Sequence, residues 1–211
     1  MREAEYASLE DAVRDLQVAD ILLVHSRKGG LVKSIRKASR SYWNHNALVF
    51  QVIPQPGALP EVLIVEALDH GIEIHRLQKY LRDPDDHVLG IKRVPDLTPE
   101  ERARILSFFL EMIDTPYDFT RLLGLFLHRL VLRIAGVKVH DYIGQRLIDV
   151  DNFVCSTFAQ RAFYMGVAPN KRDRVIFRGS HGSNFLYQME FISPGDIARS
   201  DNAEWIYNPH D

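Results

Sequence analysis

Hydrophobic residues in the first half of the chain fall into short runs of strand length. The runs ADILLVHS (19–26), NALVFQVI (46–53) and EVLIVEAL (61–68) are almost continuously apolar, which is typical of buried strands. GIEIHRL (71–77) alternates in the manner of a half-buried strand, and HVLGIKRV (87–94) is a fifth candidate. PQPGALP separates the second run from the third and predicts a hairpin turn, so we expect these two strands to pair antiparallel.

Helical patterns flank the strands. TPEERARILSFFLEMI has the clearest helix start, because Thr98 can cap, Pro99 takes the first helical position and Glu101 completes a capping box. FVCSTFAQRAFYMGV (153–167) predicts a helix that ends near Gly166. Less regular helices are expected in three further stretches: residues 1–17, the basic LVKSIRKASRS after Gly29-Gly30, and residues 119–137. This order of elements predicts an α+β fold with a central, mostly antiparallel sheet packed by helices.

Composition narrows the class of protein. The chain has 211 residues, is 46% hydrophobic and carries a formal net charge of −2, which excludes a disordered chain and argues against a general nucleic-acid binder. No repeat or linker divides it, so we expect one domain over residues 1–211, with an apolar helical insertion at about 118–138. No apolar run reaches the ~18–20 residues that span a bilayer, and the acidic N-terminus lacks a signal-peptide core. We therefore expect a cytoplasmic or membrane-peripheral protein.

Two ionisable residues stand where the apolar pattern predicts burial. Glu66 lies inside VLIVEAL, where an ionised carboxylate is costly unless a charged or hydrogen-bonding group meets it. The alternative is a strand-end carboxylate that faces water. His45 stands at the entrance of the preceding strand, and the predicted hairpin places it opposite Glu66 to within one or two residues. A carboxylate at that distance fixes the tautomer of an imidazole and stabilises its charged form.

Cys155 is the only cysteine, which excludes an intrachain disulfide and an all-cysteine metal site. With Asn152 as a cap, it falls in the first turn of a predicted helix, where free amides favour a thiolate and can stabilise an oxyanion. Alone, such a cysteine is more commonly an inert buried residue. Together with His45 and Glu66 it supplies the nucleophile, base and orienting acid of covalent acyl transfer, although the spacing does not show that the three converge.

Several short motifs follow one another in order between about residues 19 and 200. They are DILLVHS with the basic helix after it, SYWNHNALVF, VLIVEAL with Gly71-Ile72, TPYDF (115–119), FVCSTFAQRAF and SPGDIARS (193–200). The ordered set resembles the circularly permuted NlpC-type papain-like cysteine hydrolases, which are related to lecithin:retinol acyltransferase-like enzymes. The resemblance implies a papain-like fold of permuted order. It also implies that Cys155 is the nucleophile, His45 the base and Glu66 the third, orienting residue.

Three positions depart from the family's pattern. Asn44 replaces the Ser that commonly precedes the histidine, Phe153 replaces a Tyr, and Thr157 replaces the Glu after Cys-Ser. Phe153 lacks a hydroxyl that could help bind the substrate or the oxyanion. The substrate and the rate are therefore more in question than the three catalytic candidates.

The sequence predicts a thiol-dependent hydrolase that cleaves an amide or ester bond through an acyl-enzyme on Cys155. Its substrate is expected to be a cell-wall peptide, as in the wider NlpC group, or an acylated, lipid-like molecule, as in the acyltransferase relatives. Acyl transfer to a second acceptor needs the same three residues, so an acyltransferase is one alternative. Another is a non-catalytic lipid- or peptide-binding module on the same scaffold, which Phe153 favours and the Cys-His-Glu set opposes.

The stretch 119–137 is mostly apolar, and its charges are all positive. It predicts a helix that touches an anionic membrane surface or shapes a groove for an acyl chain. The alternatives are a core helix with a basic edge and a homodimer interface. The other histidines lack metal-ligand spacing, so we expect no metal and no cofactor.

Overall fold

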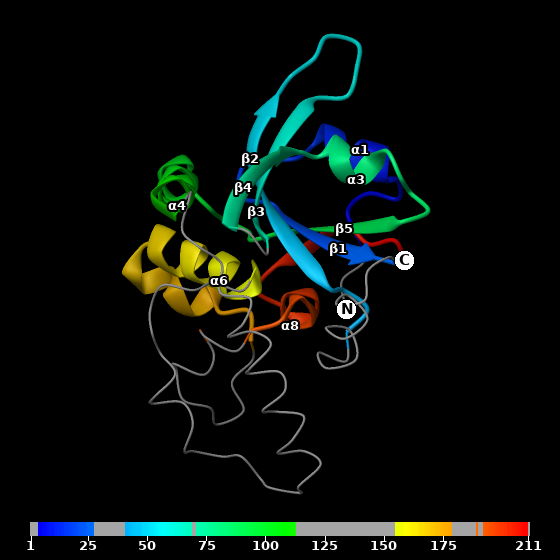
Figure 1. Ribbon diagram of the computed structural model, residues 1–211. Helices are drawn as coiled ribbons and strands as arrows, with labels where there is room; N and C mark the ends of the chain where they lie inside the picture. The colour runs from blue at the N-terminus through cyan, green and yellow to red at the C-terminus, as the bar shows by residue number, and fades with distance from the viewer. Residues whose placement is uncertain are drawn as a thin grey trace, which may run out of the picture.

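A six-stranded antiparallel sheet forms the centre of the molecule, with the strand order β4-β3-β2-β1-β5-β6 (Figure 1). The computed structural model describes residues 4–27, 41–68, 71–112, 155–178, 189 and 192–210. Its strands are β1 (Ile21–Ser26), β2 (His45–Ile53), β3 (Glu61–Leu68), β4 (Gly71–Arg76), β5 (His87–Arg93) and β6 (Glu204–Tyr207). The first five occupy the apolar runs of the sequence, and β6 is a four-residue edge strand that the pattern did not reveal. The α+β class with a mostly antiparallel sheet is therefore confirmed.

Helices cover both faces of the sheet. They are α1 (Leu9–Arg14), α3 (Gln78–Leu81), α4 (Pro99–Met112), α6 (Cys155–Gly166) and α8 (Pro194–Arg199), with a 3-10 segment η1 (Pro169–Val175). In Figure 1, α4, α6 and α8 lie on one side of the sheet, and α1 and α3 lie on the other. We call these surfaces the α6 face and the α3 face. The predicted capping box of α4 is present, since the Glu101 N–H donates to Thr98 Oγ1 at 3.2 Å and the Thr98 N–H donates to Glu101 Oε2 at 3.0 Å.

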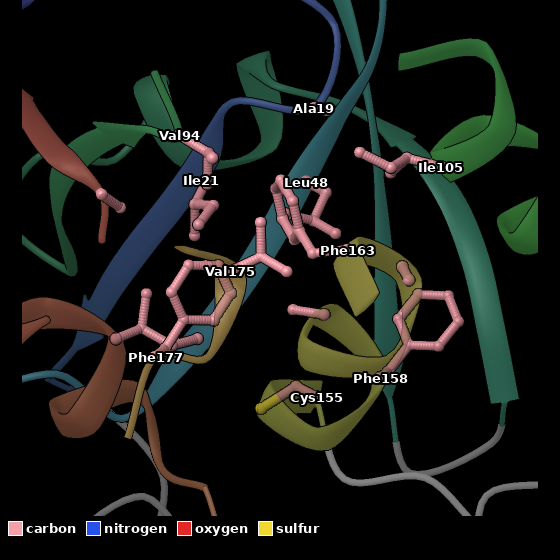
Figure 2. Packing of buried hydrophobic residues seen from close by; sticks show 14 of the residues in the cluster. Ala19, Ile21, Leu48, Val94, Ile105, Cys155, Phe158, Phe163, Val175 and Phe177 are labelled. Atoms are coloured by element: carbon pink, nitrogen blue, oxygen red, sulfur yellow. The ribbon is translucent and has the colours of Figure 1, made fainter. Parts of the chain in front are cut away.

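The α6 face carries the larger group of buried aromatic side chains. Figure 2 shows Phe158 and Phe163 of α6 among side chains from the sheet, including Ile21 of β1 and Leu48 of β2. The Phe109 ring of α4 lies 5.2 Å from that of Phe158, which joins the two helices over the sheet. This packing fixes α6 against the sheet and hence the position of its first residue.

The strands β2 and β3 part at one end of their hairpin. Their pairing runs as far as Leu48 opposite Val65. Beyond that pair, β2 continues for three residues to His45, and β3 continues for three residues to Leu68. In this stretch β2 stays paired with β1, and β3 with β4. The divergence leaves backbone groups of both strands available to other partners.

A buried ion pair ties the start of β1 to the end of β5. The guanidinium of Arg93 donates to both carboxylate oxygens of Asp20, at 2.8 Å each, and to Asp15 Oδ2 at 2.8 Å. The side chain of Asp20 is 0% exposed. These paired hydrogen bonds replace the water that both charged groups lose on burial.

Two predicted helices, the basic one after Gly30 and the one over 119–137, lie outside the described residues. Both stay predictions. Within the part of the chain that the structure describes, no helix is long and apolar enough to cross a membrane.

The buried pair yields a first prediction, the effect of Asp20→Ala on stability. The change leaves Arg93 with one carboxylate in a buried setting, so we expect the free energy of unfolding to fall by about 3 kcal/mol. Urea denaturation at neutral pH measures it. The matched control is Glu10→Ala, which removes the surface partner of Arg14 and should cost less than about 0.5 kcal/mol. Equal losses in the two variants would contradict the role of the buried pair.

Candidate active site

Glu66 is the first residue of β3 beyond its last pair with β2, and its side chain is 0% exposed. Its neighbours Val65 and Ala67 pack on the α6 face, and Ile64 packs on the α3 face. Because side chains alternate along a strand, the carboxylate of Glu66 lies on the α3 face. The carboxylate that looked out of place in an apolar strand is therefore buried rather than facing water.

Three donors surround the Glu66 carboxylate. Its Oε2 accepts from His45 Nε2 at 2.8 Å and from the Tyr80 hydroxyl at 2.5 Å, and its Oε1 accepts from Lys79 Nζ at 2.8 Å. Burial by itself raises the pKa of Glu66, but the hydrogen bonds and charge of His45, with those of Lys79 and Tyr80, reverse this and lower it to about 2. The carboxylate is ionised and held in one orientation.

His45 joins the carboxylate to the cysteine. Its Nε2 is bonded to Glu66, which leaves the other ring nitrogen for the side-chain hydrogen bond with Cys155. Burial lowers the pKa of His45, but the bonds to Cys155 and Glu66 outweigh it and raise the pKa to about 10. The imidazole is therefore protonated at neutral pH.

Cys155 is the first residue of α6 and is 8% exposed. Burial opposes the charged form of its thiol, yet the pKa of Cys155 is lowered, first by the hydrogen bond and charge of His45 and then by the main-chain N–H of Asn46. The hydroxyl of Ser156 lies 3.8 Å from the sulfur. The lowered pKa of the Cys155 thiol and the raised pKa of the His45 imidazole both favour a thiolate–imidazolium pair, with the Glu66 carboxylate behind it. An activated nucleophile has this arrangement.

The three predicted residues reach this site from opposite faces of the sheet. Ala47 packs on the α3 face, so alternation places His45 there with Glu66, whereas Cys155 belongs to the cluster of the α6 face. They meet where β2 and β3 part. The structure thus brings all three candidates together, at the end of the hairpin rather than across a regular pair of strands.

No pattern in the sequence marks Lys79, Tyr80 or Asn46 as part of the site. Lys79 and Tyr80 lie on α3, a helix of four residues that is too short to show a periodic pattern. A buried carboxylate in an apolar strand does signal that donors must exist, but that signal does not say where in the chain they are.

Of the three residues that depart from the family pattern, the structure describes two, Asn44 and Thr157. Asn44 is buried, and its amide bonds the main chain of Ser26, accepting from the N–H at 3.2 Å and donating to the carbonyl at 3.0 Å. It therefore ties the approach to β2 to the end of β1. Thr157 is buried in α6, and Phe153 lies outside the described residues.

Comparison with known proteins bears on the site. A family model described as a permuted papain-like amidase enzyme, YaeF/YiiX, C92 family, matches residues 15–123. The chain belongs to this family. The match spans more than half of the chain and includes His45 and Glu66 but ends before Cys155. Membership makes the protein a permuted papain-like hydrolase of the cysteine class.

The permuted papain-like fold is also shared with a solved structure. The metalloprotein YiiX from Escherichia coli O157:H7 matches with a TM-score of 0.54 and 14% sequence identity, over 91% of this chain and 97% of that one. A comparison with curated proteins found no match.

YiiX is described as a metalloprotein. Among the described residues, no group of three or more His, Cys, Asp or Glu side chains could hold a metal ion. His75 Nε2 comes within 3.9 Å of Glu66 Oε1, but the Lys79 ammonium already occupies that oxygen at 2.8 Å. The described side chains around Glu66 therefore do not fit a metal ion.

The lowered pKa of Glu66 predicts how stability depends on pH. Its folded pKa of about 2 lies below the ordinary glutamate pKa of 4.5, so its contribution to stability is present above about pH 4.5 and is lost as the pH falls toward 2. The difference corresponds to about 3 kcal/mol. We expect Glu66→Gln to flatten the fall in unfolding free energy between pH 5 and pH 2, as measured by urea denaturation.

The matched control for that experiment is Glu61→Gln, at the other end of β3, where the carboxylate pairs with Arg76 near the surface. If both variants flattened the pH dependence equally, Glu66 would have no special part in it.

Proposed function

We propose that this protein is an amidase that cleaves its substrate through a thioester acyl-enzyme on Cys155. The observation that carries the proposal is the relay from Glu66 through His45 to Cys155, in which each side chain contacts the next. The class of enzyme follows from the family, and the roles of the three residues are our inference from their geometry.

Acylation begins with the thiolate. The sulfur of Cys155 attacks the substrate carbonyl carbon and forms a C–S bond, while the carbonyl π electrons move onto oxygen. The first turn of α6 offers main-chain N–H groups that lack intrahelical acceptors, and these can stabilise that oxyanion. The imidazolium of His45 then donates its proton to the leaving nitrogen, the C–N bond breaks, and an amine departs from the thioester.

Deacylation uses the same residues in reverse. Neutral His45 takes a proton from water, the hydroxide oxygen bonds to the thioester carbon, and the C–S bond breaks to return the thiolate of Cys155. The carboxylate of Glu66 keeps its hydrogen bond throughout, so that the ring stays aimed at the sulfur. The products are an amine and a carboxylic acid.

An amide is the substrate bond that we favour, because the family is one of amidases. An ester of an acylated, lipid-like molecule would be cleaved by the same steps. An acceptor other than water would turn the second half into acyl transfer. The acyl-enzyme is common to all three, so its detection tests the shared core of the proposal.

Trapping tests the acyl-enzyme. The purified protein is mixed with p-nitrophenyl acetate at pH 5, where free thiols are almost unreactive, and intact mass and peptide mapping follow. We expect one acetyl group on Cys155 in the wild type and none in Cys155→Ala. Acetylation spread over surface lysines, with Cys155 unmodified, would reject the proposal.

Alkylation tests the ion pair. Iodoacetamide should modify Cys155 rapidly from mildly acidic pH upward, because the thiolate forms well below the pKa of an ordinary thiol, ~8.5. His45→Ala should move the midpoint of the rate profile up toward that ordinary value, and Glu66→Gln should move it less, because an amide still orients the ring. The control is His210→Ala, a histidine remote in sequence that contacts the Trp43 ring. A wild-type profile in His45→Ala would mean that His45 does not activate the thiol.

Contact with membranes through residues 119–137 is a separate proposal, which rests on sequence alone. Basic residues near an anionic surface contribute ~1 kcal/mol each, so we expect wild-type protein to co-sediment with anionic vesicles and not with neutral ones. Arg129→Glu together with Arg133→Glu should weaken that binding. Failure of the wild type to bind anionic vesicles would favour a soluble peptide or amide as substrate.

A further inference from the structure

Asn46 is a buried polar residue beside the nucleophile, and the mechanism above gives it no role. It follows His45 on β2 and is 2% exposed. Leu48 packs on the α6 face, so alternation places the side chain of Asn46 on that face too. There its Nδ2 donates to the main-chain carbonyl of Cys155 at 3.3 Å.

The main chain of Asn46 makes a second contact with the same residue. The N–H of Val49 donates to the carbonyl of Asp20 on the β1 side, and donors alternate along a strand, so the N–H of Asn46 faces the β3 side. Because β3 has already parted from β2 there, this N–H is not used in the sheet and donates to the sulfur of Cys155. One residue therefore holds both the sulfur and the carbonyl of the nucleophile.

The side-chain oxygen of Asn46 indicates that this residue does more than stabilise the fold. Its Oδ1 is buried and has no hydrogen-bond partner in the structure as described. A buried acceptor without a partner is unfavourable, and the one bond that Nδ2 makes is long. The carbonyl of Cys155 can also accept from the N–H one helical turn further along α6. An apolar side chain of the same size would thus suit the folded state at least as well.

We propose that Asn46 is a positioning residue, whose amide fixes the first residue of α6 so that the Cys155 sulfur stays on the Asn46 N–H and on the His45 ring. This inference rests on the proposed function. Loss of the amide should let the start of α6 shift by a fraction of an ångström, which lengthens both bonds to the sulfur. The thiolate would then be less stabilised and less well aimed.

The variant that tests this is Asn46→Leu. We expect it to fold and to melt at the wild-type temperature or higher, because it removes the unpartnered Oδ1. The acid side of its iodoacetamide rate profile should move to higher pH by on the order of one unit, since the thiolate loses hydrogen-bond support. Acetylation of Cys155 by p-nitrophenyl acetate at pH 5 should slow by on the order of 10- to 100-fold.

The matched control is Gln160→Met, which removes a buried amide from the middle of the same helix. Gln160 donates to the Val175 carbonyl at 2.7 Å and accepts from the Phe177 N–H at 2.9 Å, so both of its polar atoms are in use. Here the expected signature is the opposite one. The melting temperature should fall, and the alkylation profile of Cys155 should stay where it is.

Each outcome has a definite meaning. A folded Asn46→Leu with the wild-type profile and acetylation rate would overturn the role of Asn46 and leave the proposed function intact. If wild-type Cys155 reacted only as an ordinary thiol, the proposed function itself would fail. Should Asn46→Leu not fold, Asn46→Ala takes its place with the same expected shift in the profile. Unfolding of both variants would show that the side chain is needed for stability, and would also overturn the inference.

Discussion

The fully buried, ionised carboxylate of Glu66 is the constraint on which the site depends. A buried charge persists only where neighbouring groups replace the hydration that it has lost. Here His45, Lys79 and Tyr80 do so from two separate elements, β2 and α3. Each of these elements must be in place for the charge to be tolerated. The carboxylate in turn favours the charged imidazole of His45, which lowers the pKa of the Cys155 thiol.

The site also requires that β2 and β3 do not pair along their whole length. If β2 and β3 stayed paired to their ends, the N–H groups of β2 would be used by β3, and α6 could not reach them. By diverging after Leu48 and Val65, the strands open a place where groups from both faces of the sheet meet. The position of α6 is fixed separately, by the packing of rings such as Phe109 and Phe158. The packed core thus holds Cys155, the proposed nucleophile, at the place where β2 and β3 part.

Much of this could be predicted from the sequence because the signals were local. The apolar runs gave five strands, the Thr98 cap gave the start of α4, and a carboxylate in an apolar run marked Glu66 as unusual. The exact partners could not be predicted, because the register depends on a shift between Val49 and Gln51 that no residue type marks. The donors on α3 were out of reach for a similar reason. A four-residue helix shows no periodic pattern. The sequence also does not distinguish the tyrosine that bonds Glu66 from the other tyrosines.

The order of the motifs along the chain has a consequence for synthesis on the ribosome. The proposed base His45 and its carboxylate partner Glu66 precede the proposed nucleophile, and 110 positions separate His45 from Cys155. At ordinary rates of translation that interval lasts roughly 5 to 20 seconds. During this time β1 to β5 can emerge and pair while the nucleophile has yet to be made. Cys155 therefore meets His45 and Glu66 only when α6 docks, after most of the residues that surround it have been made and folded.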